Sequence, residues 1–283
     1  MRLSGTITRM KSWLLCALFM LQAIHAGYAY AHEVLKVGGT GGALGTMKVM
    51  ATSFEKANPE IDVRVLPSIG SSGGIKAVLE GAVQVGLSSR HLRDEERKAG
   101  LSMVSFARTP FVIVARNDVS ATNVRTSDLV KLLNGDMDKW PDGRRVRLIL
   151  RPESDSDTEY VKNISPLVAR ALKKAYDRPG VRIAMTDQEC LQIVEKTPGA
   201  VGFSSLAQVV SEKSHVKVLS YNGVVPSLKT LGQGSYRLVK EFHMVTKAKR
   251  TPSVEKFVQF VFSAKGMKII KQSGSIPLGK VTP

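Results

Sequence analysis

Short hydroxyl side chains and glycines gather where residues 66–90 read LPSIGSSGGIKAVLEGAVQVGLSSR. Ser71 and Ser72 lie within a GSSGG run, and a second serine pair, Ser88 and Ser89, closes the segment. Glycine lets a ligand approach the backbone closely, and serine adds a short hydroxyl donor. Where such a run opens a helix, unpaired amides and the helix dipole favour negative charge. The chemistry predicted here is the holding of an oxyanion, with Ser71 and Ser72 as donors.

Two other interpretations of this run stay open. Ser71 and Ser72 can simply cap the following helix, because a serine oxygen accepts hydrogen bonds from first-turn amides. The run also fits G-x-S-x-G, the nucleophile elbow, in which Ser72 would be the nucleophile of a serine hydrolase. That reaction needs an acid and a histidine. His91, His215 and His243 are available, but none of them lies in a recognisable catalytic motif.

The elements that must position these serines can be read on either side of them. Residues 61–65 alternate apolar and polar side chains, which is the period of a half-buried strand. Residues 75–82 place apolar side chains at helical spacing, and residues 83–87 predict a second short strand. That strand delivers Ser88 and Ser89 to its carboxyl end.

A similar unit precedes this one. Residues 35–37 predict a strand that runs into GGTGG, and an amphipathic helix with Met47, Met50 and Phe54 follows. The glycine run is either a tight turn or a second helix start that faces an anion. Two such units in series predict an α/β lobe with a mainly parallel sheet, whose ligands bind outside the carboxyl ends of the strands.

The rest of the chain predicts a second lobe of similar build. The segments EGAVQVGLSS and KTPGAVGFSS each give a turn, a strand and a serine pair. Between them a strand ends on Arg151, and RPESDSDT then opens a long helix whose apolar stripe runs from Val161 to Leu172. Further strands are expected at 111–115, 146–150, 200–203 and 236–246, and helices at 128–133, 187–195, 254–261 and 265–272.

The strands at 111–115 and 236–246 are the natural crossings between the lobes. Lobe one is then expected to comprise residues 32–116 plus 237–283, and lobe two residues 117–236. A cleft between two such lobes is a usual ligand site.

The start of the chain reads as a secretory signal peptide of residues 1–31. A basic stretch precedes an apolar run, WLLCALFMLQAI, that is too short to span a membrane, and Ala29-Tyr30-Ala31 forms an A-x-A cleavage site. The mature chain is expected to be secreted, and no other segment reads as membrane-spanning. Cys16 leaves with the signal, so Cys190 has no disulfide partner in the chain and is interpreted as a core residue.

The formal net charge of the 283-residue chain is +17. Such a field steers anions inward and also suits acidic surfaces. Scattered basic residues without interleaved aromatic side chains argue against nucleic acid. The sequence shows no spaced His/Cys cluster, so no metal or cofactor is expected.

Taken in order, these motifs resemble the periplasmic phosphate-binding proteins of bacterial phosphate ABC transporters. GSSGGIKAVLEGAVQVGLSSR is similar to their GSSGG-IK…G…D-x-GASD run, and TSDLVKLLNGDMDKW to their T-x-x-L-x-x-I-F-x-G-x-x-x-x-W. KTPGAVGFSSL is similar to TPGAIGYVS, and FVQFVFSAKGMKIIKQSGSIPL to their closing helix and strand motif. The resemblance covers nearly the whole mature chain. It implies an α/β fold of two lobes with flanking helices and two crossover strands, the type II periplasmic binding fold.

The resemblance also implies a set of ligand-binding residues. Ser71 matches the first serine of the family's GSSGG run, Arg151 matches its arginine, and Thr40, Gly41 and Gly42 match its first loop. Together with Ser72, these residues are expected to hold a dehydrated oxyanion, which a membrane permease then receives. The protein is expected to be a monomer without enzymatic activity.

Two departures from the family pattern concern the ligand. The family's aspartate, which accepts the proton of hydrogen phosphate and repels sulfate, falls on Ser89, so this discrimination is expected to weaken. The family's S-G-T run is replaced by SDSDT, in which Ser156 or Thr158 could donate. Asp155 or Asp157 could cap the helix, compete with an anion, pair with Arg151 or replace the missing proton acceptor.

The expected function is therefore the capture of phosphate, or a close tetrahedral oxyanion, for an ABC transporter. The alternatives are the same fold with an altered ligand and a sensory or adhesive role, and a serine hydrolase that uses Ser72.

Overall fold

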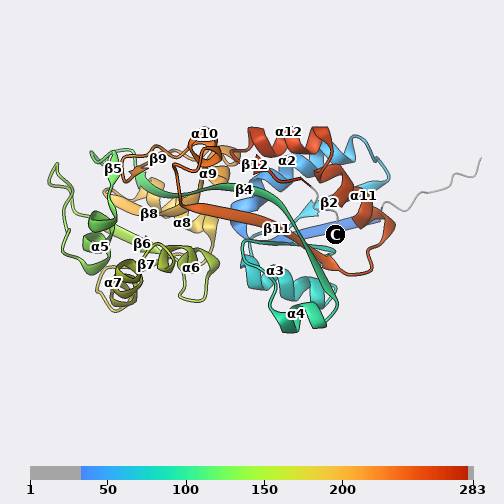
Figure 1. The fold of residues 1–283 in the computed structure, drawn as a ribbon, viewed down its shortest axis with the longest axis horizontal. Coiled ribbons are helices and arrows are strands. Elements are labelled where there is room, and N and C mark those ends of the chain that lie inside the picture. The colour runs from blue at the N-terminus through green and yellow to red at the C-terminus, as the bar shows by residue number, and fades with distance from the viewer. Residues whose placement is uncertain (1–32, 280–283) are drawn as a thin grey trace, which may run out of the picture. The chain divides into compact units, whose positions relative to one another are not determined.

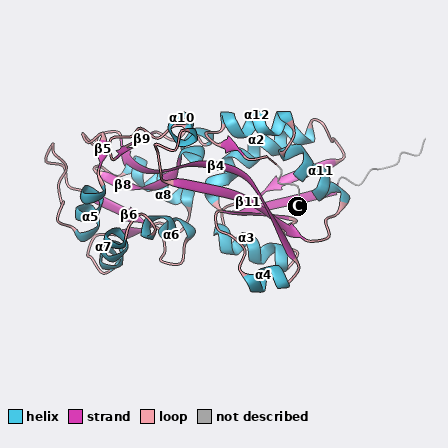
Figure 2. Cartoon of the chain, viewed as in Figure 1, coloured by secondary structure: helices cyan, strands magenta, loops and turns pink. Residues whose placement is uncertain are grey.

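The computed structural model describes residues 33–279 (Figure 1), so the predicted signal peptide lies outside the described residues. From Val34 onward the chain forms one compact unit. Helices flank the strands of its main sheet (Figure 2). The described part of the chain contains no helix that is both long and apolar enough to cross a membrane.

The main sheet is mixed. In spatial order it runs β2 (Ile61–Val65), β1 (Glu33–Gly39), β3 (Val85–Ser88), β11 (Val239–Lys247), β4 (Leu101–Arg116), β8 (Ala200–Ser205), β6 (Arg147–Leu150) and β7 (Arg182–Ile183). Two short strands, β9 (Val216–Val218) and β12 (Ile276–Pro277), also pair with β4. β5 (Asn123–Val124) and β10 (Ser220–Tyr221) form a separate parallel pair.

β4 and β11 are the two crossover strands that the sequence predicts. They run antiparallel along each other through the middle of the sheet (Figure 1). β11 also pairs with β3 on one side, whereas the second half of β4 pairs with β8 on the other. The pairs β1–β3, β6–β8 and β6–β7 are parallel. The predicted α/β fold with two crossings is therefore confirmed, and β4 is longer than the predicted strand at 111–115.

Two groups of helices cover this sheet. Around β1–β3 and the C-terminal end of the chain lie η1 (Gly41–Ala43), α2 (Leu44–Glu55), α3 (Gly70–Leu79), α4 (Asp94–Lys98), α11 (Pro252–Val261) and α12 (Ala264–Gln272). Around β6–β9 lie α5 (Thr126–Asn134), α6 (Ser156–Lys162), α7 (Pro166–Tyr176), α8 (Asp187–Lys196), α9 (Leu206–Ser211) and α10 (Leu228–Gly232). Of these, α9 also packs against α2, and its Ala207 joins the core of the first group. We refer to these groups as the first and second lobe; the predicted boundaries at 116/117 and 236/237 stay predictions.

Each lobe has its own apolar core. The first is built on residues such as Met47, Phe54 and Phe257, and the second on residues such as Leu132, Leu150 and Leu172. Burial of this apolar surface is the main stabilising contribution to each lobe. Cys190 is 1% exposed in a further cluster of the second lobe, and burial raises the pKa of its thiol to about 12. Its interpretation as a core residue is therefore confirmed.

The prediction of one long helix after RPESDSDT is wrong, because this segment forms two helices, α6 and α7. α6 ends at Lys162, and α7 begins at Pro166 after Ser165, whose side chain accepts a hydrogen bond from the Val168 amide. Proline suits the first turn of a helix but not its interior, and a capping serine marks a helix start. The apolar stripe alone does not reveal this break.

Candidate functional site

The first turn of α6 brings together several of the polar residues that the sequence singled out. Three consecutive residues there point to three different partners. The Asp155 carboxylate binds Arg151, the Ser156 hydroxyl contacts Ser71, and the Asp157 carboxylate binds Lys240. This turn therefore joins residues of the second lobe, of α3 and of the crossover strand β11.

Three hydroxyl groups meet at one point between the lobes. Ser156 Oγ lies 2.8 Å from Ser89 Oγ and 3.1 Å from Ser71 Oγ, and the last two lie 3.1 Å apart. We call Ser71, Ser89 and Ser156 the serine triangle. All three side chains are buried. Hydroxyl groups both donate and accept, so the triangle can reorient its hydrogen bonds toward an oxyanion.

The local structure around GSSGG explains where Ser71 points. α3 begins at Gly70, whose φ of 71° lies in the left-handed region that favours glycine. The N-cap position is Ile69, without a side-chain cap, so the interpretation of Ser71 and Ser72 as caps is wrong. Instead, Ser71 Oγ accepts a hydrogen bond of 2.9 Å from the Ser89 amide at the end of β3.

Ser72 lies apart from the triangle. Its side chain is exposed, and its Oγ accepts a hydrogen bond of 3.1 Å from Arg90 Nε. Arg90 is held in turn by two hydrogen bonds to the Glu96 carboxylate, whose pKa it lowers from the ordinary value. An arginine is not a general base, so this geometry offers no support for Ser72 as a nucleophile.

Thr158 does not reach the triangle either. Its hydroxyl donates 2.8 Å to the Pro152 carbonyl and lies 3.1 Å from the Tyr176 hydroxyl, both in the second lobe. Two residues of the SDSDT segment were proposed as donors. Ser156 contacts residues of the first lobe, whereas Thr158 contacts only residues of its own lobe.

Arg151 lies at the end of β6 and is 3% exposed. Its Nη2 lies 2.8 Å from Asp155 Oδ2 and 3.6 Å from Asp187 Oδ2, while Nη1 donates to the Ala184 carbonyl. Burial acts to lower the pKa of Arg151, but the neighbouring Asp187, Asp155 and Asp157 outweigh it and raise the pKa above its ordinary value. Asp155 also caps α6 by accepting a hydrogen bond from the Asp157 amide. Of the roles considered for the two acids, Asp155 therefore has two, those of helix cap and of partner to Arg151.

Asp187 is the first of two charged residues of this site that the sequence did not single out. It is 5% exposed at the start of α8, and its Oδ2 accepts a hydrogen bond of 3.0 Å from the Gly41 amide. A Cβ atom at Gly41 would lie 2.6 Å from that same oxygen, which explains why a glycine stands there. The Asp187 carboxylate therefore binds the first loop at Gly41. The sequence predicts that a ligand anion binds this same loop. Thr40 and Gly42 flank Gly41 and are buried with it.

Lys240 is the second residue that the sequence did not single out. It is fully buried in β11, its Nζ binds Asp157 Oδ1, and it lies 3.6 Å from Asp187 Oδ1. Burial acts to lower the pKa of Lys240, but Asp157 and Asp187 raise it above its ordinary value. The available signal was its spacing: Lys240, Phe242 and Met244 alternate along one predicted strand, which places the lysine with core side chains.

Asp157 is held in an unusual state for a carboxyl group. Burial raises its pKa to about 6, with Asp187 and Asp155 acting in the same direction and Lys240 opposing them. Two buried cations, Arg151 and Lys240, thus face three carboxylates. We call these five residues the charge cluster; protonation of Asp157 would balance its formal charge.

A cavity of about 450 Å³ opens beside the serine triangle. Ser89 and Ser156 lie at its wall together with Ser72, Arg90, His91 and Tyr160. The Tyr160 hydroxyl donates to the Ser89 carbonyl and accepts from the Glu241 amide, so it ties α6 to both β3 and β11. The serine triangle is thus bounded by this cavity and by the first turn of α6.

Comparison with known proteins places this geometry in context. The family model of a PBP superfamily domain matches residues 26–265. The chain is 24% identical over 253 residues to the phosphate-binding protein PstS of Borreliella burgdorferi, covering 86% of this chain and 89% of that protein. It is 25% identical over 259 residues to PstS of Bacillus subtilis, covering 89% and 83%.

Solved structures show the same fold. A phosphate ABC transporter substrate-binding protein from Clostridium perfringens, described as putative and solved with bound phosphate, aligns with a TM-score of 0.76 at 21% identity. The alignment covers 87% of this chain and 100% of that one. An ABC-type phosphate transport receptor from Vibrio cholerae aligns with a TM-score of 0.61 at 22% identity over 86% and 99%.

Proposed function

The chain belongs to the PBP superfamily, and from this premise we propose that it captures phosphate, or a close tetrahedral oxyanion, for an ABC transporter. Relatives aligned over most of their length are named phosphate-binding proteins. The observation that carries the proposal is the convergence of Ser71, Ser89 and Ser156 from two lobes onto one point. This arrangement offers several neutral donors to one small, multiply charged guest.

The position of Asp187 supports the same proposal. Its carboxylate is itself an oxyanion, held by the Gly41 amide and by the nearby cations Arg151 and Lys240. In this arrangement the Asp187 carboxylate occupies the proposed anion site. Capture of phosphate then requires the lobes to part, Asp187 to leave the Gly41 amide, and the guest oxygens to take its place.

Closure around the guest is the step that gives affinity. Hydrogen bonds to charged groups contribute about 1.5–3 kcal/mol each. The serine hydroxyls, the Gly41 amide and Arg151 would together replace the water around the anion. A fully ionised guest meets three carboxylates nearby, so a protonated oxyanion such as hydrogen phosphate is favoured over a fully ionised one.

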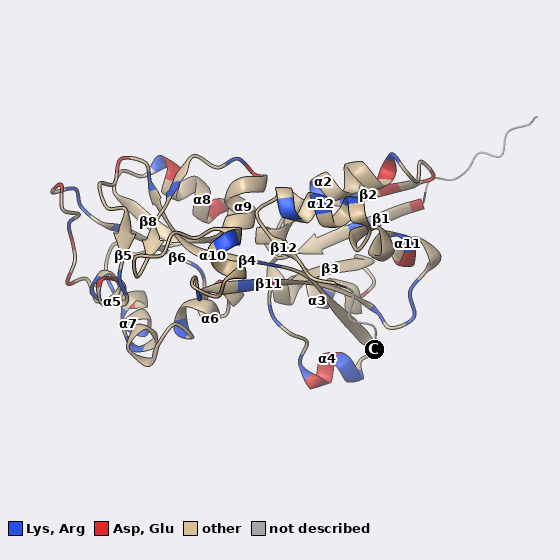
Figure 3. Ribbon diagram, turned by 45° about the horizontal axis from the view of Figure 1, so that its top comes forward, with Lys and Arg blue, Asp and Glu red and all other residues tan. Residues whose placement is uncertain are grey.

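The proposal also covers where the protein acts and what it binds besides the anion. The residues before 32 have the pattern of a signal peptide, so the protein would act outside the cytoplasm, in the periplasm, and would hand its guest to the permease of the transporter. The role is binding rather than catalysis, since Ser72 contacts an arginine and not a base. We propose a monomer without a nucleic-acid partner; the Lys and Arg residues are spread over many elements (Figure 3).

One observation favours a second candidate function, in which the same fold binds a different ligand and serves a sensory or adhesive role. Three carboxylates already face the two cations of the charge cluster, so a less charged ligand would suffer less repulsion.

Calorimetric titration of the purified protein with phosphate, sulfate, molybdate, phosphonates and carboxylates separates the two functions. We expect phosphate to bind at one site per chain, and Ser156→Ala to weaken it about tenfold, the equivalent of losing one hydrogen bond of about 1.4 kcal/mol. Ser235→Ala, which changes an exposed serine after α10, serves as the control. Binding of a carboxylate or phosphonate in place of phosphate would favour the second function.

A further inference from the structure

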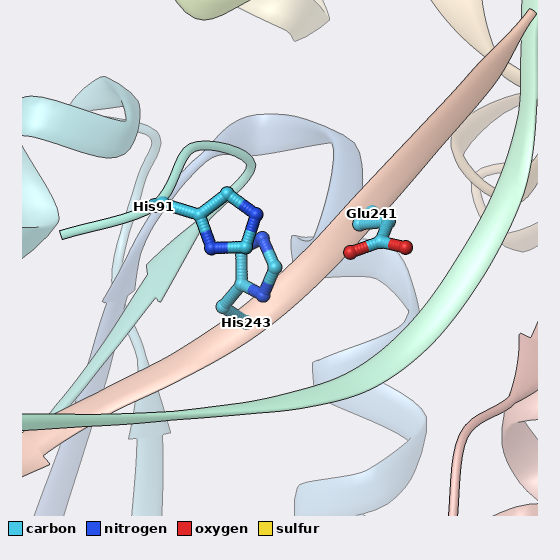
Figure 4. A group of neighbouring side chains, drawn as sticks. All are labelled: His91, Glu241 and His243. Atoms are coloured by element: carbon cyan, nitrogen blue, oxygen red, sulfur yellow. The ribbon is translucent and has the colours of Figure 1, made fainter.

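His91, Glu241 and His243 form a compact group next to the cavity beside the serine triangle. Each offers one nitrogen or oxygen atom, and these three atoms lie within 4.8 Å of one another. Figure 4 shows the His91 ring over that of His243, with the Glu241 carboxylate beside them. The two rings have their centroids 4.7 Å apart. Two imidazoles and one carboxylate form a donor set that borderline divalent metals prefer.

The strand β11 sets the geometry of this group. Glu241 and His243 are two positions apart on β11, on either side of a register shift in its pairing with β4, and their ligand atoms lie within 4.8 Å of each other. Lys240, between Val239 and Glu241, points to the other face and into the charge cluster. His91 comes from the loop after β3, which pairs with β11 through Ser88 and His243. Two members of the group therefore come from β11, and the third comes from the loop that follows its partner strand β3.

The second nitrogen of His243 is also fixed. His243 pairs with Ser105 across β11 and β4, and its Nδ1 lies 2.8 Å from Ser105 Oγ. That contact leaves Nε2 as the ligand atom. Metal-binding histidines generally make such a hydrogen bond with their other nitrogen, which sets the orientation of the ring. His243 is 1% exposed, so its ring is positioned by its surroundings before any metal arrives.

The Glu241 carboxylate is available as a ligand. In the register of β11 and β4, Glu241 lies opposite Arg108, yet the two form no ion pair within residues 33–279. Arg108 Nε is itself buried without a hydrogen-bond partner in that part of the chain. The Glu241 carboxylate therefore does not pair with Arg108, and it could coordinate a metal ion.

We propose that His91, Glu241 and His243 bind one divalent transition-metal ion of the Zn²⁺ class. Three protein ligands leave the fourth tetrahedral position open. Because His91 also lines the cavity beside the serine triangle, that position is open to water or to a small anion from the cavity. Local sequence pattern does not predict this site, because its ligands lie on segments about 150 positions apart.

Titration of the metal-free, untagged protein with ZnCl₂ by calorimetry tests this site, and Co²⁺ absorption reports its coordination. We expect one Zn²⁺ per chain, a tetrahedral Co²⁺ spectrum, and at least about tenfold weaker binding in both His91→Ala and Glu241→Gln. Ser105→Ala should also weaken binding by about tenfold, through the ring that it holds. His91 is exposed, so its variant should fold normally.

His215→Ala, which removes an exposed histidine elsewhere in the second lobe, is the matched control and should bind Zn²⁺ like the wild type. The proposal is overturned if the wild type binds no Zn²⁺, or if His91→Ala and Glu241→Gln bind it as tightly as His215→Ala does. Neither result depends on phosphate, so the outcome is separate from that of the proposed function.

Discussion

The carboxylate of Asp187 accepts a hydrogen bond of 3.0 Å from the backbone amide of Gly41, a residue 146 positions earlier in the chain. The contact joins the first loop of one lobe to the first helical turn of α8 in the other. It places a fixed negative charge where the proposed guest would offer an oxygen.

Asp187→Asn should raise the affinity for sulfate. The change keeps the shape of the side chain but removes the charge that competes with an anion for Gly41, Arg151 and Lys240. At an effective dielectric of about 20, charges about 4 Å apart interact by about 4 kcal/mol, so a gain of at least tenfold is expected. Calorimetry measures it, with the exposed Asp177→Asn as control. Unchanged or weaker sulfate binding would contradict the role given to Asp187.

Sulfate affinity should also depend on pH through Asp157. Burial raises the pKa of this carboxyl group to about 6 in the free protein. A bound anion would raise it further, so anion binding and proton uptake reinforce each other. Sulfate keeps its double charge over this range. Its affinity should therefore rise as the pH falls toward 6 and level off below, where Asp157 is already protonated in the free protein.

Asp157→Asn should remove this dependence. Titrations with sulfate at a series of pH values, on the wild type and on the variant, provide the measurement. An equally steep pH dependence in the two proteins would show that another group takes up the proton.

Lys240→Met should lower the free energy of unfolding by about 3–5 kcal/mol, because it leaves buried carboxylates without their partner. Urea denaturation measures the change. Lys247→Met, at the exposed end of the same strand, should change stability by only about 0.5 kcal/mol or less. A loss of similar size in both variants would mean that the ion pairs of Lys240 add nothing specific.

Ser89→Asp should increase the preference for phosphate over sulfate. Ser89 belongs to the serine triangle, and an acid there could accept the proton of hydrogen phosphate while repelling sulfate. The Kd for sulfate divided by the Kd for phosphate should be at least about tenfold larger in Ser89→Asp than in Ser89→Asn, whose side chain has the same shape without the charge. Equal ratios in the two variants would argue that position 89 does not face the anion.

The sequence predicted the parts of this site that depend on local pattern. Ser71 begins a helix, and Ser89 and Arg151 follow strands, so their positions can be located from periodicity and from turn residues. The expected site roles of Ser89, Arg151 and Ser156 came from the family resemblance. Asp155 as the cap of α6 follows from the same local rules. The two crossings were also predicted, since residues 111–115 form a continuous apolar run and residues 236–246 have the composition of a strand.

The parts that the sequence missed depend on contacts between distant segments. Asp187 looks like an ordinary first-turn acid of a helix, and only the packing of α8 on the first loop brings it to Gly41. His91 and His243 meet because β3 pairs with β11, a register that periodicity does not determine. The break between α6 and α7 was missed for a different reason, since both helices contribute to one apolar stripe.

The most direct test of the account is the phosphate affinity of Arg151→Ala. Arg151 is the buried guanidinium of the site, so its loss should weaken phosphate binding by about 2–5 kcal/mol, with Arg151→Lys in between. Arg147→Ala, an exposed arginine on the same strand, should bind like the wild type. If calorimetry instead finds phosphate bound equally well by the wild type, Arg151→Ala and Arg147→Ala, the anion is held elsewhere and the account is contradicted.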